Sequence, residues 1–325
     1  MILLLDDAAV RAGFDWNQAV SALRDAYAGA VDTARYPARG MARGDHGWLR
    51  TLSGAPADDG LMGAKQIAVN FHDAKGAFLI SLFDQRTSRL VALLDGHAVT
   101  GYRTAASSAL AADLLSLPGP LNVAVIGSGF EARNHVRAVA AVRELKSVRV
   151  YSPRQESRTS FAADLADLPA AVSAVDSAES AVAEATLVIC AARSRDESPT
   201  LLGEWLRPGM TVVSIGSTLP EQREVDTTVI ARSDVIIGDV VDEVRDDTGD
   251  LIAARAAGVD VVGIGSLADL VAGRHSGRTA PEQIALYKSV GSAVQDLAVA
   301  AMCVRNAERL GLGTQVADFV VPMGK

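Results

Sequence analysis

The chain of 325 residues is 49% hydrophobic and 22% charged, and its formal net charge is −8. This composition is typical of a globular protein with one large or two ordinary domains and excludes a disordered chain. Because the charge is acidic and no basic runs occur, we expect a small-molecule ligand rather than nucleic acid or an anionic membrane surface.

The elements expected in the first third of the chain indicate a lobe with an antiparallel sheet. Residues 14–30 repeat apolar side chains at helical spacing, which predicts a helix. Strand-like stretches separated by turn-rich connections follow at 47–52, 62–71, 77–83 and 90–95. A helix rich in alanine and leucine is predicted for 104–117, and Pro118-Gly119-Pro120 marks a domain boundary after it.

The next stretch has the order strand, glycine turn, helix, strand. Its turn reads Gly127-Ser128-Gly129-Phe130-Glu131-Ala132 and follows the apolar run 123–126. Gly127 permits a tight turn, Gly129 lets the backbone approach a pyrophosphate, and Ala132 keeps the helix close to the sheet. The sequence therefore predicts a dinucleotide site, with the diphosphate on the free N–H groups at the start of the helix.

The residues after the second strand of this unit, 148–151, bear on the choice of cofactor. An acidic residue there would bind the ribose of NAD, but the chain offers Ser152, Arg154 and Arg158. A hydroxyl and two guanidiniums suit a 2′-phosphate, which favours NADP over NAD. Two alternatives stay open: the arginines form a solvated helix start, or Glu156 turns toward a ribose hydroxyl.

The remainder of the chain alternates apolar runs with helical stretches. Strands are expected at 185–191, 211–215, 234–238 and 259–263. This alternation predicts an α/β fold with a doubly wound parallel sheet of the Rossmann type. A long helix is expected at 289–310 and ends at Gly311-Leu312-Gly313.

Cysteine and histidine placement argues against metal and redox chemistry. Cys190 and Cys303 lie in apolar surroundings, which favours buried thiols over a disulfide or a metal pair. The five histidines show no metal-ligand spacing, so no metal site is predicted. The apolar run at the N-terminus is too short for a signal peptide, no run reaches membrane-spanning length, and a cytoplasmic protein is expected.

Several motifs in a fixed order resemble the ornithine cyclodeaminase/mu-crystallin family over nearly the whole chain. They are Gly63-Ala64-Lys65, Arg103-Thr104-Ala105-Ala106, the glycine turn at 127–132, the loop 215–220, and Lys288-Ser289-Val290-Gly291 followed by Asp296. The combination is far more specific than any one motif. The resemblance implies a nicotinamide cofactor, with Ser289 and Gly291 among the residues that bind it.

The resemblance also implies a site for the carboxylate of an amino or imino acid, held by Lys65, Arg103 and Arg39. Arg103 is expected where a helix begins, so its guanidinium and the positive helix end would act together on the anion. Lys65 would donate a proton to the imine nitrogen if burial and neighbouring arginines lower its pKa. The alternative is that Lys65 and Arg103 form a structural salt bridge or lie on a solvated face.

Thr218 is the main departure from the family pattern. Cyclodeaminases of the family have an aspartate at this place, and a threonine hydroxyl cannot replace it as a general base. We therefore favour an NAD(P)H-dependent reductase of a small α-imino acid or cyclic ketimine, or the reverse amino acid dehydrogenase. The expected catalytic residues are Lys65, Arg103 and Thr218. Two alternatives remain: an ammonia-eliminating lyase whose carboxylate comes from Asp226, Asp239 or Asp242, and a non-catalytic NADPH-dependent binding protein.

The expected architecture has two lobes. Residues 1–117 together with 291–325 form an α+β domain for substrate binding and dimerisation, and residues 118–290 form the NAD(P)-binding Rossmann domain. The resemblance implies a homodimer that assembles through the antiparallel sheet.

Overall fold

The computed structural model describes residues 1–29, 31–57, 60–73, 75–261 and 263–323. The chain divides into two compact units, Met1–Arg103 with Ser292–Lys325 and Thr104–Gly291. The sequence placed the boundaries at 117/118 and 290/291. The observed boundary after Arg103 precedes the predicted one because it falls inside helix α3 (Gly96–Leu115), whose residues belong to both units.

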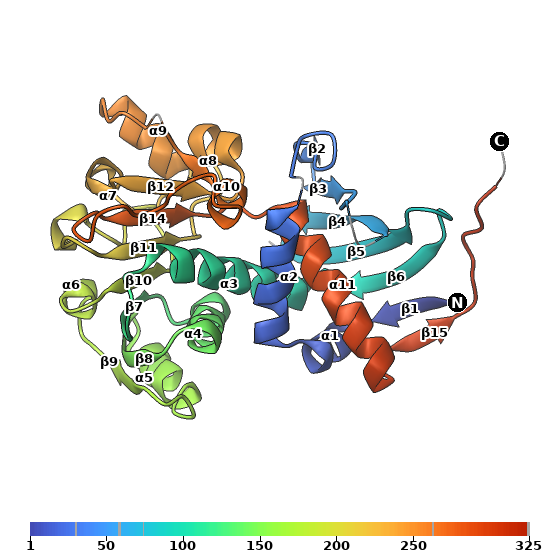
Figure 1. Ribbon diagram of the computed structural model, residues 1–325, viewed down its shortest axis with the longest axis horizontal. Coiled ribbons are helices and arrows are strands. Elements are labelled where there is room, and N and C mark those ends of the chain that lie inside the picture. Colours follow the sequence, from blue (N-terminus) through green and yellow to red (C-terminus); the bar gives the residue numbers. More distant parts are fainter. Residues whose placement is uncertain (30, 58–59, 74, 262, 324–325) are drawn as a thin grey trace. The chain divides into compact units, whose positions relative to one another are not determined.

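The second unit contains a parallel sheet, as expected for a doubly wound fold (Figure 1). In the described part of the chain its strand order is β13-β12-β14-β11-β10-β7-β8-β9. The order reverses between β7 and β10, which is the switch point where such sheets bind dinucleotides. The strands are β7 (Leu121–Ile126), β8 (Leu145–Tyr151), β9 (Ala171–Ala174), β10 (Leu187–Cys190), β11 (Thr211–Ser214), β12 (Val235–Gly238), β13 (Gly265–Ser266) and β14 (Ala285–Lys288).

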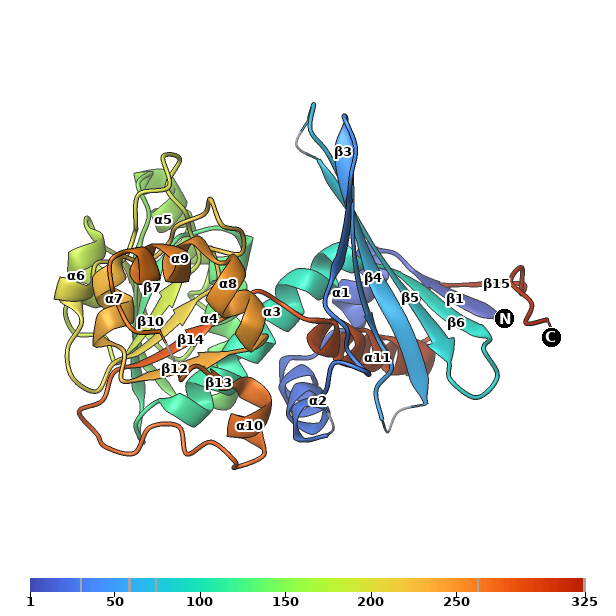
Figure 2. The ribbon, with the colours of Figure 1, turned by 90° about the horizontal axis from the view of Figure 1, so that it is seen from above.

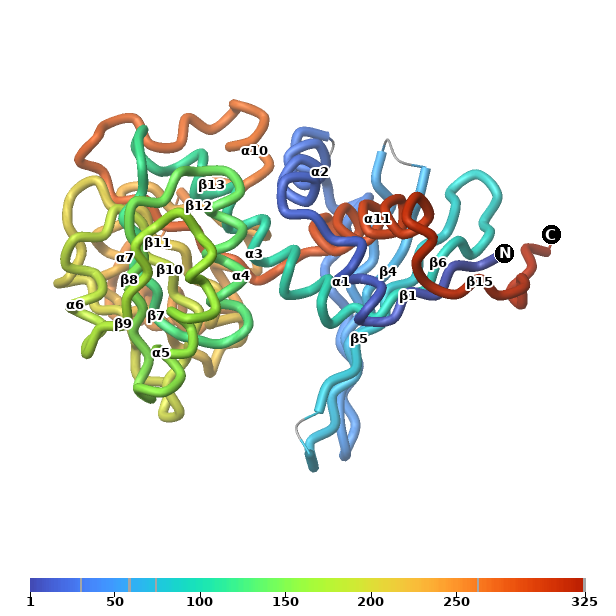
Figure 3. Tube along the Cα trace, turned by 90° about the horizontal axis from the view of Figure 1, so that it is seen from below, coloured from blue at the N-terminus to red at the C-terminus, as the bar shows by residue number. Residues whose placement is uncertain are grey.

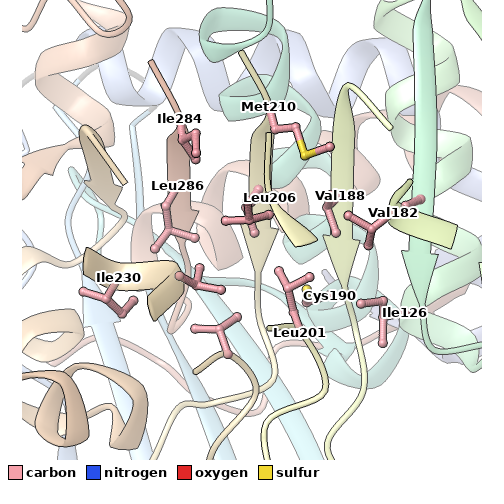
Figure 4. Close-up of a cluster of buried hydrophobic side chains, with 14 of the residues drawn as sticks. Ile126, Val182, Val188, Cys190, Leu201, Leu206, Met210, Ile230, Ile284 and Leu286 are labelled. Carbon is pink, nitrogen blue, oxygen red and sulfur yellow. The ribbon is translucent and has the colours of Figure 1, made fainter. Parts of the chain in front are cut away.

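Apolar side chains of this sheet and its helices form one core cluster. Ile126, Val188 and Leu286, from β7, β10 and β14, are buried in it (Figure 4). The central strands are apolar in almost every position because helices cover both faces of a parallel sheet. Besides α3, the helices are α4 (Phe130–Val142), α5 (Gln155–Asp164), α6 (Ala178–Val182), α7 (Thr227–Arg232), α8 (Val241–Asp247), α9 (Gly249–Ala256), α10 (Leu267–Val271) and the 3₁₀ turn η1 (Gly203–Trp205).

The first unit contains a mixed sheet of order β15-β1-β6-β5-β4-β3-β2. Strands β3 to β6 pair antiparallel, as predicted, β2 adds an antiparallel strand that was not predicted, and β1 runs parallel to β6. Strand β15, from the other end of the chain, lies beside β1 (Figure 3). The strands are β1 (Ile2–Leu5), β2 (Gly40–Arg43), β3 (Gly47–Gly54), β4 (Leu61–Asn70), β5 (Gly76–Asp84), β6 (Leu90–Asp95) and β15 (Thr314–Val316).

Helices α1 (Asp7–Gly13), α2 (Trp16–Ala28) and α11 (Ala293–Leu310) lie on one face of this sheet (Figure 2). Helix α11 packs on β3, β4 and β5. Gly63 permits this close packing, because a Cβ there would lie 2.2 Å from the carbonyl oxygen of Ser81 and 3.1 Å from Cδ2 of Leu297. The glycine two residues before Lys65 thus lets α11 approach the strand that contains the lysine.

Three predicted element boundaries differ from the structure. The helix expected from Thr104 begins at Gly96, where Asp95 Oδ1 accepts a hydrogen bond from the backbone N–H of His97 at 2.8 Å. The helix expected from Ser289 begins at Ala293, because the Ser292 side chain caps it. The strand expected at 259–263 is wrong for 259–261, position 262 lies outside the described residues, and the strand that follows is β13.

Cys190 and Cys303 are buried free thiols, as their apolar surroundings predict. Burial raises the pKa of the Cys303 thiol to about 12, so it is not a thiolate near neutral pH. Within the described ranges, no helix is both long enough and apolar enough to cross a membrane.

Candidate active site

Lys65 lies in the middle of β4 and points to the buried face of the first sheet. Its register neighbours, Leu52 on β3 and Ile80 on β5, are buried apolar residues. Only 1% of Lys65 is exposed, yet its ammonium has polar partners. Nζ donates to Asp296 Oδ1 at 2.7 Å and to Thr100 Oγ1 at 3.4 Å. Lys65 therefore places a charged group between buried apolar side chains of the two neighbouring strands.

Arg103 is the second buried cation of this cluster, with 6% of its surface exposed. Its Nε lies 2.9 Å from the same oxygen, Asp296 Oδ1, and its Nη1 donates to Gln295 Oε1 at 2.5 Å. The expectation that Arg103 stands at a helix start is wrong, because α3 begins two turns earlier, at Gly96. The positive end of that helix is too far along the chain to assist Arg103, since the effect is confined to the first turn.

The first turn of α11 supplies the polar partners of both cations; Asp296 belongs to the family motifs, but neither it nor Gln295 was predicted to contact Lys65 or Arg103. Asp296 is fully buried, and its Oδ2 accepts no hydrogen bond from the described part of the chain. Gln295 is held in turn by Tyr27, whose hydroxyl accepts from Nε2 at 2.9 Å. A signal was present: Gln295-Asp296 interrupts a long apolar run in 290–304, where a buried carboxylate needs a cation.

Burial is the largest cause of an altered pKa at Lys65. Burial and the charges of Arg103 and Arg39 lower the pKa, the carboxylate of Asp296 raises it, and the pKa of Lys65 falls from 10.5 to about 7. Arg39, in the segment before β2, is partly buried and close enough to contribute to this effect. An ammonium with a pKa near 7 exists in both protonation states at neutral pH, which suits a group that donates a proton.

The glycine turn of the second unit has the geometry that a dinucleotide needs. Gly127 has φ = 115°, and a Cβ there would lie 2.6 Å from the carbonyl oxygen of Ala191. Gly129 is the N-cap of α4, has no side-chain cap, and has open space where a Cβ would stand. Ala132 is fully buried on the sheet side of the helix. Phe130 and Glu131 begin the helix, and a helix N-terminus is where a diphosphate binds in this type of turn.

A polar pocket of about 390 Å³ lies beside this turn and extends to the end of β8; its lining includes Ser128, Gly129, Arg133, Arg154 and Ser160. Ser128 Oγ donates to Ser152 Oγ at 2.9 Å, and Ser152 is buried behind the lining residue Ser128.

The predicted arginines of this pocket differ in their contacts. Arg154 is exposed and lines the pocket, whereas Arg158 pairs with Asp176 at 2.7 Å and does not line it. Arg133, which the sequence reasoning did not select, lines the pocket and donates to the carbonyl oxygen of Ser128. The structure thus brings Ser128 and Arg154 together, leaves Arg158 aside, and adds Arg133.

Ser289 and Gly291 lie in the segment that follows β14. The carboxylate of Asp239 holds both, because it accepts from Ser289 Oγ at 2.7 Å and from the backbone N–H of Gly291 at 2.8 Å. Gly291 has φ = 81°, a backbone conformation that favours glycine. The structure therefore gives both residues a role in the shape of this segment, and their contact with a cofactor stays a prediction.

Thr218 lies in the loop after β11 and is partly buried. Its backbone N–H and its hydroxyl donate to Gln222 Oε1, at 2.9 and 3.2 Å. The three aspartates considered as substitutes for a carboxylate at this place already have structural partners. Asp226 caps α7, Asp239 holds the segment after β14, and Asp242 pairs with Arg245 at the surface.

A parallel sheet with a dinucleotide turn, in a chain that also holds a buried cationic cluster, defines a Rossmann-type oxidoreductase. The chain belongs to the ornithine cyclodeaminase/mu-crystallin family, whose model matches residues 19–310. It is 30% identical to a Delta(1)-pyrroline-2-carboxylate reductase of Paracoccus denitrificans, over 89% of this chain and 92% of the relative. It is 29% identical to the ketimine reductase mu-crystallin of Mus musculus, over 73% of this chain and 71% of the relative.

Solved structures are similar over the whole chain. One is the Delta(1)-pyrroline-2-carboxylate reductase of Thermococcus litoralis in complex with NADH and L-proline, with 26% sequence identity and a TM-score of 0.88. The similarity covers 97% of this chain and 100% of that one. The family predicted from the motifs is confirmed, and so is the fold class.

Proposed function

We propose that this protein is a nicotinamide-dependent reductase of small α-imino acids, cyclic ketimines included, and that it also runs the reverse reaction as an amino acid dehydrogenase. The observation that supports this most directly is the cluster in which Lys65 and Arg103 share one oxygen of Asp296. The names of the relatives, pyrroline-2-carboxylate reductase and ketimine reductase, agree with it.

The charge balance of this cluster favours an anionic substrate. Two buried cations face a single carboxylate, and the charge of Arg39 adds to theirs at Lys65. Surplus positive charge in a buried place is unfavourable until an anion neutralises it. A substrate carboxylate would supply that charge, and Arg103 and Arg39 offer planar guanidiniums for it.

Lys65 is proposed to donate the proton of the reaction. The nicotinamide cofactor supplies a hydride when bound, and the carbon of the C=N bond receives it. Nζ of Lys65 gives its proton to the nitrogen, so the C=N double bond becomes a C–N single bond with one new C–H and one new N–H bond. Lys65 is left neutral and is protonated again from solvent. Because its pKa is about 7, kcat/KM should fall about tenfold per pH unit above that value.

The cofactor is proposed to be NADPH rather than NADH. Arg154 and Arg133 both line the polar pocket at the end of β8, with the hydroxyls of Ser128 and Ser160. Two guanidiniums beside hydroxyl groups suit a 2′-phosphate. Glu156 also lines this pocket and would oppose a phosphate, so the ratio of the two affinities measures which group dominates. Arg154→Ala should raise the Kd of NADPH about tenfold and leave that of NADH unchanged.

A cytoplasmic homodimer remains a prediction. Both cysteines are free thiols, which fits a reducing compartment. Analytical ultracentrifugation of the purified chain measures the number of subunits directly.

The deciding experiment is oxidation of NADPH and of NADH in the presence of a cyclic imino acid such as pyrroline-2-carboxylate, with Lys65→Met as the inactive control. Imine-dependent oxidation that Lys65→Met abolishes supports the proposal. Ammonia release from ornithine with no net change in cofactor would instead identify a lyase, although Thr218 stands where a base would be needed. Dinucleotide binding without turnover of either substrate would identify a binding protein.

A further inference from the structure

A second cluster of buried charges lies at the carboxyl ends of β11 and β14, within the second unit. Ser214, Glu224, Asp250 and Lys288 are all fully buried. Lys288 Nζ donates to Ser214 Oγ at 2.8 Å and to Asp250 Oδ2 at 2.9 Å. Ser214 Oγ in turn donates to Glu224 Oε2 at 2.7 Å. None of these side chains has a part in the reaction proposed above.

Glu224 holds two turns of the backbone with one carboxylate. Its Oε2 accepts from the backbone N–H of Gly216 at 2.8 Å, and its Oε1 accepts from that of Ala192 at 3.1 Å. Gly216 belongs to the loop after β11, and Ala192 to the turn after β10. The backbone around Glu224 is itself fixed, because Asp250 Oδ1 accepts from the N–H groups of Glu224 and Val225 at 2.9 and 3.2 Å.

The turn after β10 adjoins the glycine turn, and the loop after β11 contains the proposed catalytic Thr218. The segment with Ala191 and Ala192 packs against Gly127. A Cβ at Gly127 would lie 2.6 Å from the carbonyl oxygen of Ala191 and 3.0 Å from the Cβ of Ala192. The loop with Gly216 continues to Thr218 two residues later. In a doubly wound sheet the adenosine half of the ligand lies over the strands on one side of the switch point, and the other half lies over the strands on the opposite side. β10 and β11 are on that opposite side.

The fit between Glu224 and Gly216 is close. A Cβ at Gly216 would lie 2.4 Å from Glu224 Oε1, and the backbone of Gly216 is not in the left-handed region. Glycine is therefore required there by the carboxylate, not by its own backbone conformation. A buried carboxylate that only filled space would be no better than an apolar side chain.

We infer that Glu224 is a positioning residue for the nicotinamide half of the dinucleotide, because its carboxylate fixes the turns after β10 and β11 to each other. This inference rests on the proposed function, since it assumes a nicotinamide dinucleotide. Loss of the carboxylate frees both turns, while the glycine turn and the polar pocket at the end of β8 keep their own contacts.

The test compares NADH with ADP-ribose, which lacks the nicotinamide half, by calorimetric titration of the full chain. Glu224→Gln keeps the shape of the side chain but leaves one backbone N–H opposite an amide N–H. We expect the Kd of NADH to rise about tenfold, the change that fits one buried donor without an acceptor, and that of ADP-ribose to change less than about twofold. The matched control is Glu221→Gln, an exposed carboxylate in the same loop, which should leave both values within about twofold of the wild type.

A second variant covers the case in which Glu224→Gln does not fold. Gly216→Ala changes no charge but displaces the carboxylate, and it should produce the same selective loss of NADH affinity. The inference is overturned if the variant that folds binds NADH as tightly as the wild type, or if NADH and ADP-ribose weaken equally. A wild-type chain that binds neither NADH nor NADPH would overturn the proposed function and this inference together.

Discussion

Each unit of this protein buries a lysine against an aspartate, and the two clusters differ in their charge balance. Lys65 and Arg103 share one carboxylate, Asp296, so positive charge is in excess. Lys288 faces two carboxylates, Asp250 directly and Glu224 through Ser214, and Arg223 Nε lies 3.4 Å from Asp250 Oδ1, so two cations balance two carboxylates. Burial lowers the pKa of Lys65 to about 7 and raises that of Glu224 to about 7.

The two clusters also differ in how completely their acceptors are used. In the second, each carboxylate oxygen of Glu224 and Asp250 accepts a hydrogen bond, and backbone N–H groups are among the donors. In the first, Asp296 Oδ2 accepts none from the described residues. A saturated cluster fixes the backbone, whereas an unsaturated one retains capacity for a ligand. Surplus positive charge and an unused acceptor distinguish the first cluster, which we propose to be reactive, from the second, which holds the backbone.

Replacement of the first lysine should have the largest effect on activity. Lys65→Met removes the proposed proton donor and one of the carboxylate-binding cations. We expect kcat/KM for imine reduction to fall about 10⁴-fold. Lys75→Met, at an exposed lysine after the same strand, is the control and should retain wild-type activity. Substantial activity in Lys65→Met would mean that another group protonates the imine.

Replacement of the second lysine should mainly reduce stability. Lys288→Met removes the fully buried cation of this cluster and leaves Asp250 only the longer contact with the partly exposed Arg223, so the free energy of unfolding should fall by about 3–5 kcal/mol. Urea unfolding measures the change. Lys65→Met should lose less, because the buried Arg103 remains 2.9 Å from Asp296, whereas Arg223 is more exposed and lies 3.4 Å from Asp250. Equal losses in the two variants would contradict the assignment of a structural role to one cluster only.

A change of cation type in the first cluster tests substrate binding. Arg103→Lys keeps the charge but removes the planar guanidinium that contacts Asp296 and Gln295. We expect KM for the imino acid to rise about 10- to 100-fold, with a smaller change in kcat. Steady-state kinetics separate the two values. The control is Arg11→Lys, at an exposed arginine on α1 that pairs with Asp7, and it should leave KM unchanged.

The smallest effect is a pair of opposite slopes in stability against pH. Between pH 7 and 10.5 the unfolded chain binds the Lys65 proton and the folded chain does not, so this group makes stability rise with pH. Between pH 4.5 and 7 the folded chain keeps a proton on Glu224 that the unfolded chain has lost, so this group makes stability fall with pH. Each slope is at most about 1.4 kcal/mol per pH unit.

Urea unfolding at several pH values measures both slopes. Lys65→Met should remove the rise above pH 7 and keep the fall below it, and Glu224→Gln should do the reverse. If either variant removed both slopes, the two groups would not titrate independently.

Local patterns in the chain were sufficient for the dinucleotide turn and for most strands. The spacing of Gly127, Gly129 and Ala132 depends on the backbone of one short segment, so the sequence alone determines it. The alternation of β3 to β6 and the apolar runs of β7, β8, β10, β11 and β12 are likewise local, whereas the mostly exposed β9 was not predicted. The predicted helix start at Thr104 was wrong because the signal at Asp95-Gly96 is a hydrogen bond of one side chain, which no apolar period reveals.

Only the tertiary structure decided which groups meet. Lys65 and Asp296 are 231 residues apart in the chain, and their contact depends on the packing of α11 over the glycine at position 63. Arg158 was expected at the cofactor but pairs with Asp176, while Arg133 takes the place beside the pocket. The sequence determines which elements form because their signals are local; it does not show these partners, because burial and long-range packing select them and thereby set the pKa of each charged group.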